Sequence, residues 1–319
     1  MDTGSVLLKQ LSYFQTGGNC HKLYMPASID EASEVIHEIN TLKIPYFILG
    51  GGSNSLVWDE DYDGAVISLA KMQFLSIDGS KIHCGAGVSN SDLCQYAYRN
   101  SLSGIGWMYR LPGQVGGTVR MNARCYGGEI SQVVTKVYCI SSSGKKLQRE
   151  GKHIFRGYKD TLFMSNQDLI VAADFLLDAV DSSKHIYEKM QFCEEDREKK
   201  HQFDWPSCGC VFKNDYSVGV PSGMLLEHAG AKELKVGNAI VSLYHSNFIY
   251  NQSASSRDIL QLSFMMRQKV WEEFGVWLEY EMEILGKLPA DLDKLVHEKR
   301  TFAPKYERLK PLKEKFKQA

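Results

Sequence analysis

The chain has 319 residues, of which 44% are hydrophobic and 24% are charged. These are ordinary proportions for a globular protein, so intrinsically disordered, collagen-like and coiled-coil chains are excluded. Lysine and arginine number 37 and acidic residues 38, which leaves a net charge of -1. Without a basic excess, we expect neither nucleic acid nor a membrane as a partner.

Two features bear on the cellular location. No apolar run approaches the roughly 20 residues needed to cross a bilayer, and the N-terminal segment lacks a cationic region followed by an apolar one. We therefore expect a cytoplasmic protein. The eight cysteines are scattered through a chain that is long enough to build a sizeable core, so we expect buried thiols rather than disulfides.

The first half of the chain predicts one amphipathic helix and a series of strands. Ser28 and Glu31 have the spacing of a capping box, and the apolar residues that follow at helical intervals predict a helix that ends before Pro45. Those apolar residues are Ala32, Val35, Ile36 and Ile39. Short apolar runs predict strands at residues 46–49, 64–69, 81–85, 133–140 and 169–177.

Two glycine-rich segments interrupt these elements, LGGGSNS at residues 49–55 and PGQVGG at residues 112–117. The first is not a Rossmann fingerprint, because its third glycine would fall at Ser55 and no helix follows with an acidic residue about 20 positions on. Either segment could be an ordinary tight turn. Successive backbone N–H groups in such loops can also form a nest for phosphate, so the two loops together indicate one long, doubly phosphorylated ligand.

The second half of the chain is more charged. The run at residues 194–204 is either a domain boundary or the solvated face of a helix. Apolar residues recur at helical spacing from Ser256 to Phe274, and Gly275 is placed to end that helix. The tail from Lys287 on is basic and divided by prolines, so we expect an appendage with one or two short helices and no catalytic group.

Two further motifs contain groups that could carry chemistry. PSCGCVFKN, at residues 206–214, holds two thiols, but zinc would need a second pair of ligands, so no metal site is expected. Either its small residues pack a turn, or Cys210 is a proton donor, because an unperturbed thiol is mostly protonated at neutral pH. Glu279 and Glu281 alternate with apolar residues, as on one face of a strand. Solvated strand carboxylates are common, so the pattern alone assigns no reaction.

Taken in order, seven motifs resemble the UDP-N-acetylenolpyruvoylglucosamine reductase family, flavoenzymes of peptidoglycan precursor synthesis. The resemblance extends from about Thr16 to Gly286 and therefore covers most of the chain. The motifs are LGGGSNSLV, LPGQVGGTVRMNA with CYGGEI, GYKDTLF, PSCGCVFKN, GMLLEHAGAKELKVGNAIVS, HSNFIYN and GVWLEYEMEILG.

The resemblance implies an α+β protein, with a two-subdomain FAD-binding fold of the vanillyl-alcohol-oxidase (PCMH) type followed by a C-terminal α+β substrate domain. The implied boundaries are 1–185 for the FAD-binding domain, with subdomains at about 1–71 and 72–185, and 186–286 for the substrate domain. The last strand of the family region would return to the flavin domain. Residues 287–319 would form a basic C-terminal tail.

The resemblance also implies a reaction. NADPH would deliver a hydride to FAD, which would then reduce the small-molecule substrate, the enolpyruvyl ether of UDP-N-acetylglucosamine, to UDP-N-acetylmuramate. We expect a monomer, with a weak dimer as the alternative. Two rivals stay open: a flavoprotein of the same fold with altered or lost substrate specificity, and a vestigial nucleotide-binding module whose basic tail recruits a partner.

The matching positions imply the site residues. The FAD diphosphate would be held by Gly50, Gly51, Gly52, Ser53, Asn54, Ser55 and Leu56 in the first loop and by Pro112, Gly113, Gly116 and Gly117 in the second. Lys159 and Glu281 would stand beside the substrate carboxylate, and Cys210 would protonate the adjacent carbon from the face opposite the flavin. The residues along the substrate would be Tyr126, Asn214 and His245.

The chain departs from the family pattern at three of these positions. Lys159 stands where arginine is usual, and an ammonium cannot form the bidentate contact that a guanidinium makes with a carboxylate. Cys210 replaces a serine and Arg124 a glycine, so we hypothesise that Arg124 supplies part of the missing guanidinium function. The short interval between the motifs of Lys159 and Cys210 indicates the class without an extra tyrosine-bearing loop.

Overall fold

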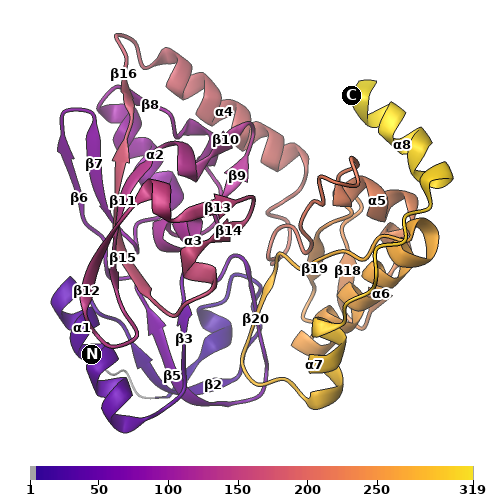
Figure 1. The fold of residues 1–319 in the computed structure, drawn as a ribbon, viewed down its shortest axis with the longest axis horizontal. Helices are drawn as coiled ribbons and strands as arrows, with labels where there is room; N and C mark the ends of the chain where they lie inside the picture. The colour runs from indigo at the N-terminus through magenta and orange to yellow at the C-terminus, as the bar shows by residue number, and fades with distance from the viewer. Residues whose placement is uncertain (1–4, 319) are drawn as a thin grey trace. The chain divides into compact units, whose positions relative to one another are not determined.

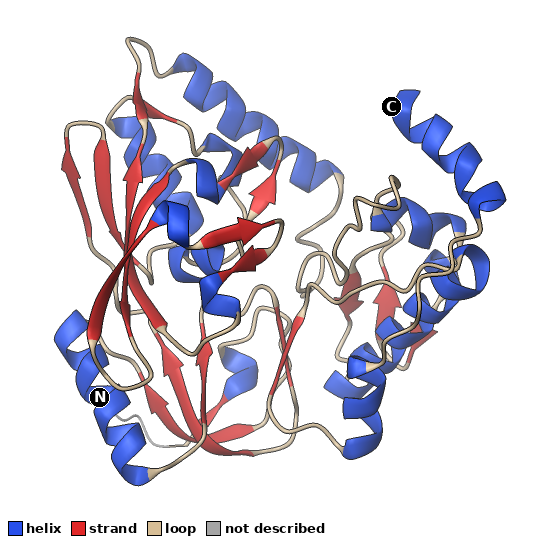
Figure 2. Cartoon of the chain, in the orientation of Figure 1, coloured by secondary structure: helices blue, strands red, loops and turns tan. Residues whose placement is uncertain are grey.

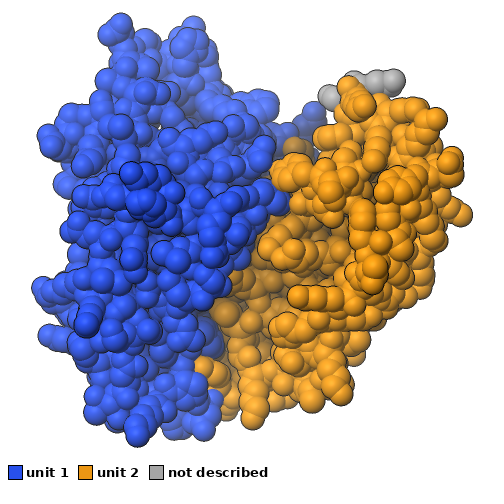
Figure 3. Space-filling view, viewed as in Figure 1, with its two compact units in different colours: residues 1–6, 20–51, 63–199 blue, residues 7–19, 52–62, 200–319 orange. Residues whose placement is uncertain are grey.

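A computed structural model describes residues 5–318 of the chain, which form a mixture of helices and strands (Figure 2). The chain divides into two compact units, each built from separate stretches of sequence (Figure 3). Unit 1 comprises the chain up to Val6 and residues 20–51 and 63–199, and unit 2 comprises residues 7–19, 52–62 and those from Lys200 on. The α+β composition expected from the sequence is confirmed. The predicted domain boundaries stay a prediction.

Two sheets form the framework of unit 1 (Figure 1). One has the order β1-β2-β5-β3, in which β3 pairs with β5 in parallel. The other is antiparallel throughout and has the order β12-β11-β15-β7-β6. The strands of the first are β1 (Val6–Leu7), β2 (Asn19–Tyr24), β3 (Tyr46–Leu49) and β5 (Tyr62–Ser68), and those of the second are β6 (Leu75–Asp78), β7 (Lys81–Gly85), β11 (Val134–Ile140), β12 (Lys146–Glu150) and β15 (Leu169–Leu176).

Shorter elements complete unit 1. The helices are α1 (Ile29–Leu42), α2 (Asn90–Arg99), α3 (Val115–Arg120) and α4 (Lys184–Lys199). The remaining strands pair in twos: β8 (Leu102–Ser103) with β16 (Asp178–Ala179), β9 (Arg124–Cys125) with β10 (Gly128–Glu129), and β13 (Phe155–Gly157) with β14 (Asp160–Thr161). Buried apolar side chains from α1, β5, β15 and their neighbours form one continuous core.

The predicted N-terminal helix is confirmed as α1. Ser28 is its N-cap, and the Ser28 side chain accepts a hydrogen bond from the backbone N–H of Glu31. The Glu31 carboxylate accepts from the N–H of Ala27, one residue earlier than a standard capping box requires. The four apolar residues of the predicted face are buried. All five predicted strands are present, with ends that agree within about two residues, the usual uncertainty of strand limits.

The second glycine-rich segment differs from its prediction. Residues 112–114 precede α3, but Val115, Gly116 and Gly117 form the first turn of that helix rather than a loop. The reason lies in backbone pairing: the N–H of Val115 donates to the carbonyl of Val88, and the N–H of Gly116 donates to the carbonyl of Ala86, both at 2.9 Å. These two bonds hold the start of α3 against the end of β7.

Unit 2 combines two small sheets with four helices. In one sheet β4 (Ser55–Val57) pairs in parallel with β20 (Glu283–Leu285), and in the other β17 (Lys235–Val236), β18 (Ala239–Val241) and β19 (Ile249–Asn251) follow in antiparallel order. The helices are α5 (Ser222–His228), α6 (Ser256–Phe274), α7 (Ala290–His297) and α8 (Tyr306–Gln318). The predicted long helix is therefore confirmed, and Gly275 ends it in the left-handed conformation with φ 67°.

The tail was expected to be an appendage, and this is wrong. It does form two helices, but Leu292, Leu309 and Leu312 are buried in the core of unit 2. A second correction concerns residues 276–282, which do not form a regular strand, because among them only Tyr280 forms a bridge, to Phe212. The predicted alternation survives there: Leu278 and Met282 are buried, whereas Glu279 is exposed.

Candidate active site

The two glycine segments approach each other closely within unit 1. A Cβ atom on Gly51 would lie 3.0 Å from the Cα of Gly113, so a side chain on Gly51 would push the loops apart. A Cβ on Gly50 would lie 4.0 Å from Oε1 of Gln114. The structure thus brings together the segments that the sequence assigned to one ligand.

The surroundings of these segments suit a polar ligand. A Cβ on Gly117 would meet no atom of the described part of the chain within 4 Å, so the backbone there faces open space. Within residues 5–318, the buried Oε1 of Gln114 and Oδ1 of Asn122 have no hydrogen-bond partner. Such buried polar atoms are costly unless a water or a ligand satisfies them. The N–H of Gly116, by contrast, is already bonded to Ala86.

The remainder of the first loop belongs to unit 2 and is held by that unit. Gly52 has φ +65°, and a Cβ there would lie 2.7 Å from the carbonyl oxygen of Leu11. The Asn54 side chain donates to the carbonyl of Glu281 at 2.9 Å, and its own carbonyl accepts from Glu283. Ser55 and Leu56 lie in β4 opposite β20, and Leu56 is fully buried. Asn54 therefore fixes the backbone beside Glu281.

Backbone pairing in unit 2 brings the predicted proton donor and the predicted acid together. The carbonyl of Val211, next to Cys210, accepts hydrogen bonds from the N–H groups of Glu281 at 2.9 Å and Met282 at 3.2 Å. Two residues further on, the N–H of Lys213 donates to the carbonyl of Glu279 at 2.9 Å. Residues about 70 positions apart are thereby fixed as neighbours by main-chain bonds.

Asn247 supports the same segment, although it was not among the predicted site residues. Its Oδ1 accepts from the N–H of Phe212 at 3.0 Å, and its Nδ2 donates to the carbonyl of Phe212 at 2.8 Å. The side chain thus makes the two hydrogen bonds to Phe212 that a neighbouring strand would make. Its position in the HSNF motif was the available signal in the sequence. Asn247 is buried, and a buried asparagine generally has specific hydrogen-bond partners.

The two thiols of PSCGCVFKN differ in their surroundings. Cys208 is buried, and burial raises its pKa, with smaller contributions from Cys210 and Glu281. Cys210 is partly exposed. A fully buried thiol behaves as a small apolar side chain, so Cys210 is the better placed of the two to exchange a proton with a ligand.

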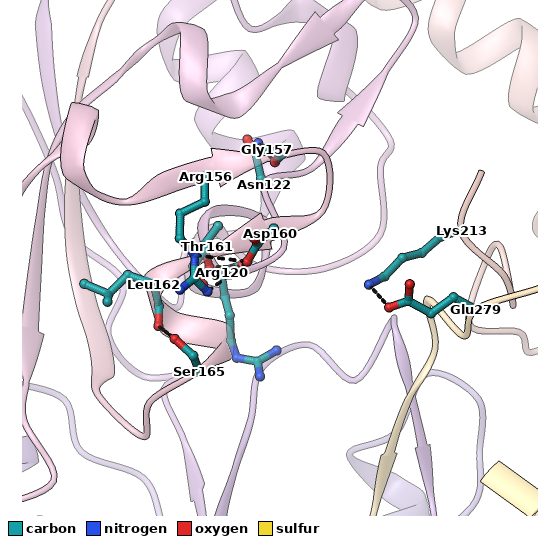
Figure 4. A network of polar contacts seen from close by, with 10 residues as sticks. All are labelled: Arg120, Asn122, Arg156, Gly157, Asp160, Thr161, Leu162, Ser165, Lys213 and Glu279. Carbon is teal, nitrogen blue, oxygen red and sulfur yellow. Dashed lines mark hydrogen bonds and ion pairs between the residues drawn. The ribbon is translucent and has the colours of Figure 1, made fainter. Parts of the chain in front are cut away.

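The two glutamates of the last motif also differ. Glu279 is 74% exposed, and its Oε1 lies 2.6 Å from Nζ of Lys213 (Figure 4). An exposed pair of this kind contributes about 0–1 kcal/mol to stability. Glu281 is partly buried, and its backbone is held at both its N–H and its carbonyl.

Lys159 lies in the turn between β13 and β14 and is 9% exposed, with φ 51°. Arg156 holds the turn: its Nη2 donates to Oδ1 of Asp160 at 2.8 Å and to the carbonyl of Thr161 at 2.6 Å (Figure 4). Asn122 donates to the carbonyl of Gly157 at 2.9 Å. A buried lysine on a left-handed residue is unusual, and such positions cluster at functional sites.

Arg124, the other cation considered, lies on β9 and is exposed. Its Nη1 is 3.9 Å from Oε2 of Glu129. Oε1 of Glu129 also accepts from Nδ2 of Asn122 at 2.9 Å and from the hydroxyl of Ser131 at 2.5 Å. The guanidinium of Arg124 therefore faces a carboxylate of its own unit, and its role toward a substrate stays a prediction.

Tyr126 is held by helix α4. Its hydroxyl donates to Oδ2 of Asp196 at 2.6 Å, and Nζ of Lys189 donates to its carbonyl at 3.0 Å. The guanidinium carbon of Arg197 lies 4.8 Å from the centre of the ring. Burial and the bond to Asp196 raise the pKa of Tyr126, so its hydroxyl stays protonated and can act as a donor.

Asn214 and His245 both have structural contacts in unit 2. Oδ1 of Asn214 accepts from the N–H of Ser222 at 2.8 Å, at the start of α5. Nδ1 of His245 lies 3.3 Å from the N–H of Asn247, and the His245 ring lies against Phe248 at 4.5 Å between ring centres. Burial lowers the pKa of His245 to about 4, so the ring is neutral at pH 7.

The lowered pKa of His245 predicts acid sensitivity. In the unfolded chain an ordinary histidine binds a proton below about pH 6.5, whereas the folded chain resists protonation until about pH 4. Stability should therefore fall as the pH falls through this window, by about 1–2 kcal/mol between pH 7 and pH 5. Urea unfolding at both pH values should show that His245→Asn removes this loss.

His185→Asn is the matched control, because the His185 side chain is 92% exposed. It should leave the difference between pH 7 and pH 5 unchanged. If His245→Asn and the parent chain lose the same stability, the buried neutral ring is not the source.

Comparisons with known proteins agree with this arrangement. The family model for the UDP-N-acetylenolpyruvoylglucosamine reductase C-terminal domain matches residues 200–285, and that for an FAD binding domain matches residues 21–148. The expected combination of an FAD-binding fold with a second α+β domain is thereby confirmed. None of the helices among residues 5–318 combines the length and apolar character needed to span a bilayer.

Proteins that are similar over most of the chain belong to the same reductase family. The chain is 38% identical to the UDP-N-acetylenolpyruvoylglucosamine reductase of Borrelia garinii over 84% of this chain and 89% of the relative, and 35% identical to that of Clostridium tetani over 88% and 91%. The crystal structure of the reductase from Thermus caldophilus matches with a TM-score of 0.75 and 30% identity, over 89% of this chain and 99% of that one. The chain therefore belongs to the UDP-N-acetylenolpyruvoylglucosamine reductase family.

Proposed function

We propose that this protein reduces the enolpyruvyl ether of UDP-N-acetylglucosamine to UDP-N-acetylmuramate, with FAD as its cofactor and NADPH as its reductant. The observation that carries the proposal is the pairing in unit 2 that fixes the Cys210 motif beside Glu281. The family's name describes reduction of this enolpyruvyl sugar, and relatives cover most of the chain.

The glycine segments would hold FAD. Open space at Gly117 and the buried polar atoms of Gln114 and Asn122 fit a polar ligand such as a diphosphate. We assign the FAD contacts to Gly50, Gly51, Gly52, Ser53, Asn54, Ser55 and Leu56, and to Pro112, Gly113, Gly116 and Gly117. Gly116 would contribute through its close approach rather than its N–H, which is bonded to Ala86. When bound, FAD would supply hydride transfer from NADPH to the substrate.

The chain's own groups would manage charge and protons. Adding hydride to an enolpyruvyl ether places negative charge on the conjugated carboxylate, and cationic or acidic donors must stabilise that charge. Lys159 would supply the cation and Glu281 the acid. Cys210 would donate the proton from its Sγ to the substrate carbon adjacent to that carboxylate. A thiol is more acidic than the hydroxyl of the usual serine, so it can serve as this proton donor.

Tyr126, Asn214, His245 and Arg124 would contact the rest of the substrate. At pH 7 the hydroxyl of Tyr126 and the neutral ring of His245 would act as uncharged hydrogen-bonding groups. Arg124 would add the guanidinium that Lys159 lacks. The cytoplasmic location, the monomeric state and the absence of nucleic-acid and membrane partners stay predictions.

The role of Cys210 predicts that the two half-reactions separate. Cys210→Ala should leave flavin reduction by NADPH intact and slow reoxidation by the enolpyruvyl sugar about 100-fold, because only the second step needs the proton. Anaerobic stopped-flow absorbance measures both rates.

Cys208→Ala is the control for this experiment, because it removes the buried thiol of the same motif. It should leave both rates near those of the parent enzyme. Equal loss of the two half-reactions in Cys210→Ala would contradict the assigned role, and reoxidation of the parent enzyme by other acceptors alone would favour a same-fold flavoprotein with another substrate.

The open space at Gly117 predicts opposite effects on stability and cofactor affinity. Alanine at this helical position should stabilise the apoprotein by up to about 1 kcal/mol, because alanine favours helix over glycine. The added methyl group should nevertheless weaken FAD binding about tenfold if the diphosphate lies against that backbone. Urea unfolding and fluorescence titration with FAD measure the two quantities.

Gly223→Ala is a matched control, since Gly223 lies in the first turn of α5 and a Cβ there would make an ordinary contact of 3.5 Å with His245. It should leave FAD affinity unchanged. Unaltered FAD affinity in Gly117→Ala would remove α3 from the cofactor site.

A further inference from the structure

Arg267, on α6, is a buried cation that the proposed reaction does not use. It is 2% exposed, and its guanidinium carbon lies 4.1 Å from the centre of the Trp277 ring and 4.6 Å from that of the Tyr280 ring. Cation–π contacts of this kind are strongest where water is excluded. Arginine stays charged in proteins, so this charge must be balanced by its surroundings.

The hydrogen bonds of Arg267 run to the tail. Nη2 donates to the carbonyl of Leu295 at 2.5 Å, and Nη1 lies 3.5 Å from the carbonyl of Val296. Both carbonyls belong to the last turn of α7, where helix carbonyls lack intrahelical partners and the helix dipole is negative. The carbonyls at the end of α7 therefore pair with the two terminal nitrogens of the buried guanidinium.

Tyr280 connects this cluster to the proposed active site. Its ring stacks on Phe212 with 5.1 Å between ring centres, and its hydroxyl lies 3.0 Å from the hydroxyl of Ser263. The next residue is Glu281, whose N–H bonds to Val211. A shift of the Tyr280 ring would thus move the backbone that carries Glu281.

Other tail residues contact Trp277, at the start of the same segment. Nε1 of Trp277 donates to the carbonyl of Glu298 at 2.8 Å, and Arg300 lies 4.1 Å from the centre of the Trp277 ring. A Cβ on Gly275 would lie only 1.8 Å from the carbonyl oxygen of Ala303, so the tail passes directly over the end of α6. These tail residues lie beyond residue 285, where the match to the family's C-terminal domain ends.

We propose that Arg267 is a positioning residue for Glu281, and that α7 and the following tail are the part of the chain that holds Arg267 in place. The inference rests on the proposed function for its catalytic consequence. Its structural part, the order of the backbone at residues 276–282, can be measured without any substrate.

The test replaces Arg267 by lysine, which keeps the charge but cannot span two carbonyls and two rings at once. Hydrogen exchange of the peptide covering residues 276–282 should become about tenfold faster, because the Glu281 N–H loses its protection. Reoxidation of the flavin by the enolpyruvyl sugar should slow about tenfold, with NADPH reduction unchanged, since small misplacement of a catalytic group costs this much or more. Rates are expressed per bound flavin.

Arg300→Lys is the matched control, because Arg300 also lies on Trp277 but has no contact with Tyr280 among the described residues. It should leave the exchange and both half-reactions near those of the parent enzyme. If Arg267→Lys does not fold, Tyr280→Leu removes the intervening ring and should produce the same changes.

The outcomes are distinct. Unchanged exchange in Arg267→Lys, or equal changes in Arg300→Lys, would overturn the positioning role. Faster exchange in a protein whose parent enzyme is never reoxidised by the sugar would support the positioning role and overturn the proposed function instead.

Discussion

The main-chain pairing of residues 211–213 with residues 279–282 is the constraint on which the proposed chemistry depends. A thiol and a carboxylate can act on neighbouring atoms of a substrate only if their separation is fixed, and two flexible segments would lose most of that advantage to conformational entropy. Here Val211 and Lys213 bond to the opposite backbone, and Asn247 bonds to Phe212 between them. The pairing in unit 2 is therefore made by backbone groups and does not depend on the side chain of Cys210.

The glycine segments show a second constraint of the same kind. Gly51 is required by its close approach to Gly113, and Gly52 by its left-handed backbone and by the nearby Leu11 carbonyl. Gly117 is different, because no atom of the described residues 5–318 would lie within 4 Å of a Cβ there. Where no contact within the protein requires a glycine, close approach of a ligand to the backbone can require it.

Local signals in the sequence predicted much of the fold. The periodicity and caps of α1 and α6, the left-handed stop at Gly275 and the runs that became β7 and β11 all depend on residues close together in the chain. The first turn of α3 was missed because the bonds from Val115 and Gly116 reach residues almost 30 positions away. The burial of the tail was missed because its basic composition indicated an exposed segment, although three of its leucines pack into the core of unit 2.

The difference between local signals and contacts of distant residues also holds for the site. Family motifs selected Cys210, Lys159 and Glu281 directly. The support that Asn247 gives to Phe212, and Arg156 to the turn that carries Lys159, became visible only through their contacts. Reoxidation of reduced parent enzyme under anaerobic conditions tests most directly whether the protein reduces the enolpyruvyl sugar. We expect flavin absorbance to return on mixing with the enolpyruvyl ether of UDP-N-acetylglucosamine and to stay bleached with UDP-N-acetylglucosamine itself. Absorbance that stays bleached with both sugars, or returns equally with both, would contradict this expectation.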